Sequence, residues 1–189
     1  HRRRHSFPTG RSSDLGEETI SALNAALTGR DFYGVRMTAA ISLGEIGGDD
    51  ARAILTERCR SEADSRVRRS IVWALGSFKD DAATDLLREV AQQDESYFAT
   101  VAAVRALAAF GTDKAFDAMK SVLGRTSWQE IITASVFHGI AQAKDKRGVD
   151  LAIEHSKYGK SVPIRVAAIA CLGTLGKELN KESKAEHIL

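Results

Sequence analysis

Apolar residues recur along this chain with a period of about 32 residues, and within each period they follow helical spacing. In the first half of each period, three apolar positions lie five and then three residues apart, on one broad face of a helix. Their columns are Val35, Val67, Ala99, Ile131 and Ile164; Ala40, Val72, Val104, Val136 and Ile169; and Leu43, Leu75, Leu107, Gly139 and Leu172. The step into the last unit is one residue longer than in the others at Ile164, Ile169 and Leu172. The pattern predicts the first helix of five repeated units.

A second apolar stripe follows in each unit, with its members four residues apart on one face of a second helix. Its columns are Ala51, Ala83 and Ala115; Leu55, Leu87, Met119 and Leu151; and Cys59, Ala91, Leu123 and His155. The same register places Leu23 and Leu27 on this stripe. Residues 16–30 are therefore predicted to be the second helix of a unit whose first helix is missing.

Repeated helix pairs of ~32 residues bury their apolar faces by stacking on their neighbours. The predicted fold class is all-α: an α-solenoid, a right-handed superhelix of about five such pairs over residues 31–176. Residues 177–189 begin with a run of lysines and glutamates and are expected to form a charged linker and the start of a last helix. Units cut at both ends indicate a fragment of a longer protein.

An aspartate lies in the turn between the two helices of four successive units. The four residues are Asp49, Asp81, Asp113 and Asp145, evenly spaced with one in each repeat. A short acidic side chain at this place can accept the free N–H groups at the start of the second helix and suits its dipole. Helix capping is the favoured interpretation, and a carboxylate ladder for cations is the alternative.

An arginine column runs through the first helices at Arg36, Arg68 and Arg165, and Thr100 and Ile132 interrupt it. One interpretation is a structural arginine that pairs with carboxylates or helix C-terminal carbonyls of the neighbouring unit. The other is a basic stripe that binds an acidic partner. Two tryptophans, Trp73 and Trp128, are interpreted as packing residues rather than as platforms for stacked bases.

The chain has 189 residues, 43% of them hydrophobic and 28% charged, which favours a packed core over disorder. Its net charge of +2 arises in residues 1–15, which hold four arginines and one aspartate, so the remainder carries −1. The string HSFPTGRSSDL resembles a translated sequencing adapter, and residues 1–15 are therefore expected to be a non-native or disordered leader. The negative remainder argues against nucleic acid as a partner. The lack of an apolar run of about 18 residues argues against a membrane.

The sequence offers no constellation of residues for catalysis. The histidines outside the leader are His138, His155 and His187, and they form neither H-x-x-x-H nor HExxH, which disfavours a zinc site. Cys59 and Cys171 lie about four repeats apart, on the order of 40 Å along a stack, so both are predicted core residues and not a disulfide. No catalytic, cofactor-binding or metal residue is assigned, and no cofactor is expected in this fragment.

A first helix of the form V-R-x-x-A-x-x-x-L-G followed by an aspartate turn resembles HEAT repeats of the short bacterial type, over residues 31–176. The segments DFYGVRMTAAISLGEIG (31–47), DESYFATVAAVRALAAFG (94–111) and SWQEIITASVFHGIA (127–141) resemble, in this order, the C-terminal helical-repeat region of bacterial family M1 zinc aminopeptidases. In that family, an upstream domain carries HExxH and a further glutamate, and this chain contains neither.

The resemblance implies a non-catalytic domain that packs on an upstream catalytic domain, which would hold zinc, and that shapes peptide access. The alternative is a HEAT-repeat scaffold for protein–protein interaction, similar to phycobilisome-lyase-like repeat proteins. The expected partner is accordingly the catalytic domain or another protein or peptide. A compartment is not indicated by the sequence, and cytoplasmic and periplasmic locations both stay open.

Overall fold

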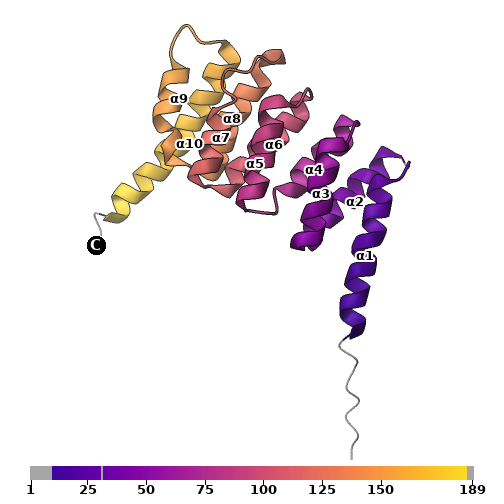
Figure 1. Ribbon diagram of the computed structural model, residues 1–189. Coiled ribbons are helices and arrows are strands. Elements are labelled where there is room, and N and C mark those ends of the chain that lie inside the picture. Colours follow the sequence, from indigo (N-terminus) through magenta and orange to yellow (C-terminus); the bar gives the residue numbers. More distant parts are fainter. Residues whose placement is uncertain (1–9, 31, 187–189) are drawn as a thin grey trace, which may run out of the picture.

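The computed structural model describes residues 10–30 and 32–186 and contains, within these ranges, ten α-helices, two short 3-10 helices and no strand. Figure 1 shows the helices following one another in pairs along a single stack. The α-helices are α1 (Gly10–Thr28), α2 (Tyr33–Ile46), α3 (Gly48–Ser61), α4 (Ser65–Leu75), α5 (Asp81–Gln93), α6 (Tyr97–Phe110), α7 (Asp113–Lys120), α8 (Ile131–Ala143), α9 (Val149–Ser156) and α10 (Val162–Glu186). The 3-10 helices are η1 (Trp128–Glu130) and η2 (Lys146–Gly148).

The helices form two layers. The even-numbered helices α2, α4, α6, α8 and α10, called layer A here, each pack against the next one along the stack. The odd-numbered helices, called layer B, pack mainly onto layer A, as α1 does on α2 and α5 does on α6. Because each unit contacts only its neighbours, the fold is an α-solenoid, as the repeat period predicts.

The core lies between the two layers and follows most of the predicted apolar columns, although Val35, the first member of its column, is 48% exposed. The leucines of the layer A column, Leu43, Leu75 and Leu107, are fully buried, and so are Leu55 and Leu87 of the layer B column. In the preceding helix α1, Leu27 is also fully buried. The second-helix stripe predicted for residues 16–30 is therefore present and packs on α2.

Small residues allow the helices of layer A to approach one another closely. A Cβ atom added to Gly44 in α2 would lie 2.7 Å from the Cβ of Ala74 in α4. The same crowding occurs at Gly139 of α8, where an added Cβ would lie 2.9 Å from the Cβ of Ala108 in α6. The close approach leaves no room for a side chain at these two glycines.

The predicted register fails at one position of the last unit, Ile169, whereas Ile164 and Leu172 pack against the core. Ile169, which the sequence places in a core column, is 53% exposed in α10, whereas Ala168 and Cys171 are buried. Ala168 and Cys171 follow Val136 and Gly139 at the same spacing as in the earlier units, so the buried face keeps a constant period. The longer step predicted for this unit is therefore wrong at Ile169, because the fully buried residues of α10 keep the 32-residue spacing of the earlier units.

Two predicted boundaries also differ from the structure. Helix α1 begins at Gly10, so residues 10–15 are helical and continuous with 16–28, while residues 1–9 of the predicted leader lie outside the described residues. Helix α10 runs without a break from Val162 to Glu186, so the charged linker predicted from residue 177 is part of a helix. Residues rich in Lys and Glu are good helix formers, and a linker is not required there.

Candidate interaction surface

The three arginines of the predicted column bind the ends of layer B helices. In each case a guanidinium N–H donates to a backbone carbonyl in the last turn of the preceding layer B helix or just after it. The accepting atoms are Leu27 O at 3.2 Å from Arg36, Glu62 O at 2.8 Å from Arg68 and Ser156 O at 3.3 Å from Arg165. Carbonyls at a helix C-terminus lack intrahelical donors and favour a nearby cation. These guanidinium groups therefore connect consecutive helices and do not form a free basic stripe.

Where Thr100 interrupts the column, a different arginine takes its place. Arg125, in the segment after α7, donates to Ala91 O at 2.6 Å and to Asp94 O at 2.9 Å, which lie at the end of α5. It also donates to the hydroxyl of Thr100 at 3.1 Å. Sequence analysis missed Arg125 because it lies outside the repeated column.

Two acidic residues complete this network, and sequence analysis missed them as well. Glu62 and Asp94 follow Arg36 and Arg68 at the same distance along the chain and are one repeat apart, a regularity that could have revealed them. Asp94 accepts two hydrogen bonds from Arg68, at 2.5 and 2.8 Å, in the paired geometry that suits guanidinium and carboxylate. Its side chain is only 6% exposed.

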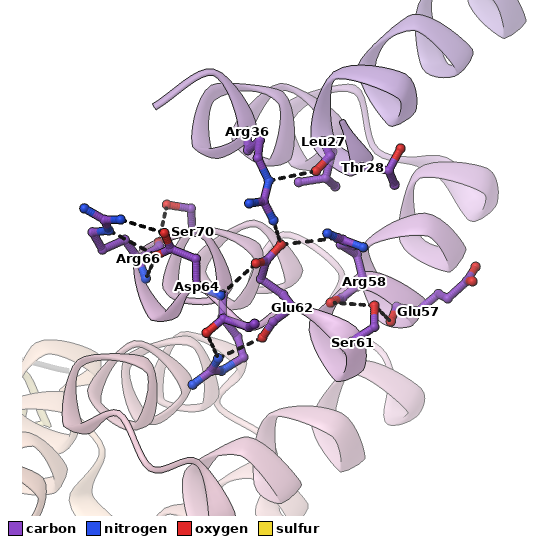
Figure 2. Close-up of polar contacts among 12 residues, drawn as sticks. Leu27, Thr28, Arg36, Glu57, Arg58, Ser61, Glu62, Asp64, Arg66 and Ser70 are labelled. Atoms are coloured by element: carbon purple, nitrogen blue, oxygen red, sulfur yellow. Dashed lines mark hydrogen bonds and ion pairs between the residues drawn. The ribbon is translucent and has the colours of Figure 1, made fainter. Parts of the chain in front are cut away.

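Figure 2 shows Arg36 and Arg58 pointing toward the carboxylate of Glu62 from two different helices. The backbone N–H of Asp64 donates to the same carboxylate at 2.8 Å. Burial tends to raise the pKa of Glu62, but the hydrogen bonds from Arg36 and the Asp64 amide outweigh it and lower the pKa below its usual 4.5. Glu62 is therefore a buried carboxylate that joins α2, α3 and the start of α4.

Substituting Glu62→Gln is expected to reduce the acid sensitivity of the fold. A carboxyl whose pKa is lowered in the folded state stabilises the fold fully above its unfolded pKa, and this stabilisation is lost as the pH falls. The free energy of unfolding of the unsubstituted chain should therefore fall more steeply from about pH 5 to pH 3 than that of the variant. Urea titrations at several pH values measure both slopes, and equal slopes would contradict this role of Glu62.

The predicted capping aspartates do not all cap. The side chains that accept the first N–H groups of α5 and α7 belong to Asp80 and Thr112, one residue before Asp81 and Asp113. Asp49 likewise lies inside the first turn of α3, after the N-cap Gly47. Of the four predicted residues, Asp145 caps a helix, and that helix is the short η2. The capping prediction is therefore wrong for Asp49, Asp81 and Asp113, although first-turn acidic residues still suit the helix dipole.

These aspartates instead pair with cations that connect neighbouring turns. Arg52 pairs with Asp49 at 2.8 Å in its own helix and with Asp80 in the next unit. The same kind of bridge joins Lys114 to Asp81 at 3.5 Å and Arg147 to Asp113 and Asp145. The aspartate side chains of the turns are therefore paired within the protein rather than presented as an empty cation ladder.

A groove lies between α3 and α5 on layer B, where the two helices hardly touch. It consists of two adjoining cavities of about 330 and 540 Å³, with Arg60, Leu86 and Glu89 in the walls of both. Cys59 lies in the wall of the smaller cavity, and burial is the main cause that raises its pKa to about 12. Its thiol is therefore protonated at neutral pH and packs as a small apolar side chain, as predicted.

The largest departure from prediction concerns the tryptophans. Trp73 in α4 is 58% exposed and Trp128 in η1 is 68% exposed, so neither packs in the core. Phe98, at the start of α6, is 61% exposed. Trp73 lies on the same face of α4 as Arg69, one turn away, and Phe98 lies on the same face of α6 as Arg105, two turns away. We call Arg69, Trp73, Phe98 and Arg105, on two adjacent helices, the layer A patch.

No group of three or more histidine, cysteine, aspartate or glutamate side chains within residues 16–30 and 32–180 is placed to hold a metal ion. His138 is exposed on α8, whereas the Nδ1 of His155 lies 2.9 Å from Leu151 O inside its own helix. His187 lies outside the described residues.

Over the described part of the chain, none of the helices combines the length and apolar character needed to cross a membrane.

The stacked helix pairs agree with a comparison against known families. The family of HEAT repeats matches residues 10–76 and 60–138, which together span well over half of the chain. This chain is a HEAT-repeat protein. The match begins at the same residue as α1, and it includes both helices that carry the layer A patch.

Solved structures with a similar fold include two proteins with different functions. One is human deoxyhypusine hydroxylase in complex with glycerol, with a TM-score of 0.59 and 17% identity over 88% of this chain and 66% of that one. The other is the complex of CpcE and CpcF of phycocyanin lyase from Nostoc sp. PCC7120, with a TM-score of 0.63 and 19% identity over 93% of this chain and 71% of that one. No curated protein sequence matches this HEAT-repeat chain. At these identities the likeness concerns the fold alone.

Proposed function

We propose that this HEAT-repeat chain is a non-catalytic scaffold that binds another protein through the layer A patch. The observation that carries the proposal is the exposure of Trp73 and Phe98, 58% and 61%, on two helices packed side by side. Large aromatic side chains at protein interfaces contribute most of the binding energy, and arginine is the charged residue most enriched beside them. A patch of both kinds on a solenoid face fits a docking surface.

The similar solved structures support this proposal only in part. The phycocyanin lyase structure is itself a complex of two chains, CpcE and CpcF, which is consistent with a solenoid that binds a protein. The deoxyhypusine hydroxylase shares the fold and is named for an enzymatic activity, so the fold by itself does not decide the function. The layer A patch, and not the likeness, is therefore the basis of the proposal.

The proposal is tested with the double variant Trp73→Ala/Phe98→Ala as bait in affinity capture, followed by binding measurements with each purified candidate partner. Ile153→Ala is the matched control, because Ile153 is 46% exposed on α9 of layer B. A partner should bind the unsubstituted chain and the control with equal affinity and the double variant at least about fivefold more weakly. Equal affinity for all three proteins would contradict the proposal.

A second candidate function is a repeat region of a family M1 zinc aminopeptidase, in which the solenoid packs on a catalytic domain and shapes peptide access. The observation that favours it is the order of the unit starts, with Ser96-Tyr97-Phe98 and then Ser127-Trp128. An intact upstream reading frame that encodes HExxH and a downstream glutamate would support it, and a frame without them would contradict it. The same reading frame tests the proposed adapter origin of residues 1–15.

A further inference from the structure

Acidic residues are distributed unequally between the two layers. Helices α4, α6 and α8, in the middle of layer A, contain no aspartate or glutamate. Every helix of layer B contains at least two. The chain as a whole is close to neutral because the positive charge of layer A and the negative charge of layer B nearly cancel.

Two arginines on the basic layer are available to a ligand. The side chains of Arg69 and Arg105 are exposed, and their guanidinium groups make no hydrogen bond or ion pair with any described residue. Their neighbour Arg66 differs, because it pairs with Asp64 at 2.7 Å and lies over the ring of Tyr33. The free positive charge of α4 and α6 is therefore concentrated at Arg69 and Arg105.

The two arginines flank the exposed aromatic side chains. Arg69 and Trp73 are one helical turn apart on α4. Trp73 and Arg105 occupy equivalent positions of consecutive units, one repeat apart, on helices that pack against each other. Phe98 lies two turns before Arg105 on the same face of α6. An elongated ligand along this face would meet positive and apolar groups in alternation.

From this arrangement we infer that the layer A patch binds an acidic segment of a partner protein that also carries apolar side chains. The inference rests on the proposed function and names the chemistry of the partner. Carboxylates of the segment form paired hydrogen bonds with Arg69 and Arg105, and its apolar side chains cover Trp73 and Phe98. The absence of acidic residues on α4 and α6 means that nothing on these helices repels such a segment.

Charge complementarity distinguishes this ligand from two others. A nucleic acid is bound by a continuous run of lysines and arginines along its phosphates, whereas this patch offers two free arginines separated by apolar rings. A second copy of this chain would have to present its acidic layer B, whose carboxylates lie among arginines and lysines of the same layer, as Asp80 does beside Arg52 and Asp85 beside Lys114. An acidic and partly apolar protein segment satisfies both features of the patch.

The test uses the full chain and three fluorescently labelled peptides of equal length. The first is built from Glu, Leu and Phe at helical spacing, the second has Gln at each Glu, and the third has Lys. The acidic peptide should bind at least about tenfold more tightly than the neutral one, and the difference should shrink with added salt. The basic peptide should bind more weakly than both. Equal binding of the acidic and neutral peptides would overturn the inference.

The variant Arg69→Gln/Arg105→Gln is expected to lose the preference for the acidic peptide and to keep its residual binding to the neutral one. Arg88→Gln is the matched control, because Arg88 is exposed on α5 of layer B. Far-UV circular dichroism and melting curves establish that each variant is folded. An unchanged preference in the double arginine variant, or tighter binding of a single-stranded oligonucleotide than of the acidic peptide, would overturn the inference.

The failure of this inference can be distinguished from that of the proposed function. If a captured partner requires Trp73 and Phe98 but binds equally well to the double arginine variant, the scaffold function stands and the acidic ligand is wrong. If that partner binds equally well without the two aromatic side chains, the proposed function is wrong.

Discussion

Substituting Arg68→Ala should destabilise the protein by about 3 kcal/mol, which is a large share of the stability of a typical domain. Arg68 is 17% exposed and its carboxylate partner Asp94 is 6% exposed, so the pair lies largely out of water. Removing one partner leaves a buried carboxylate without its counter-charge, and this desolvation cost cannot be recovered. The substitution also removes the donor to Glu62 O at the end of α3.

The adjacent residue provides the matched control for this prediction. Arg69 follows Arg68 in the same helix, but its side chain is exposed and its guanidinium group makes no hydrogen bond or ion pair within the described part of the chain. Arg69→Ala should therefore change the free energy of unfolding by no more than about 0.5 kcal/mol. Urea denaturation followed by far-UV circular dichroism measures both variants under the same conditions.

A double-mutant cycle then separates the charge pair from the rest of the arginine. If the buried carboxylate causes the loss, Arg68→Ala/Asp94→Ala should be less destabilised than the sum of the two single variants. If the two single-variant effects are additive, the loss of stability instead comes from the carbonyls at the end of α3, which no longer receive hydrogen bonds from Arg68. Equal stability of the Arg68→Ala and Arg69→Ala variants would contradict the structural role of Arg68 altogether.

The repeat period carries enough information to predict the helix pairs, because burial in a solenoid repeats with the unit. Leu43, Leu75 and Leu107 occupy one column in the sequence and are fully buried in the structure. The same reasoning fails at Ile169, which continues the apolar column in the sequence but lies on the exposed face of α10. A helix rotates by about 100° per residue, so an error of one residue moves a side chain from core to surface.

The polar network was only partly predictable. The arginine column is visible in the sequence, but its acidic partners lie most of a repeat away, so the pairing depends on how one unit stacks on the next.

Exposure of Trp73 could not be predicted from its type, since tryptophan is usually mostly buried. Trp73 is exposed because Ala74 and Leu75 already fill the contact face of α4. An aromatic residue outside the buried columns therefore indicates the candidate interaction surface.

Two glycines of the same sequence motif should respond in opposite ways to the same substitution. Gly44 and Gly173 both follow the leucine column of their helices, at the end of the L-G pair. At Gly44, a Cβ would lie 2.7 Å from the Cβ of Ala74 and 2.9 Å from its Cα, so α2 and α4 would have to move apart. At Gly173, an added Cβ would have no neighbouring atom within 4 Å apart from the adjacent backbone of its own helix.

Gly44→Ala should therefore destabilise the protein by about 2 kcal/mol, because overpacking outweighs the gain in helix propensity. Gly173→Ala should stabilise it by about 0.5 to 1 kcal/mol, because only the propensity changes in an exposed helix. Thermal and urea unfolding of the two variants measure the difference. Stabilisation by both substitutions would mean that α2 and α4 separate without cost and would contradict the close packing of layer A.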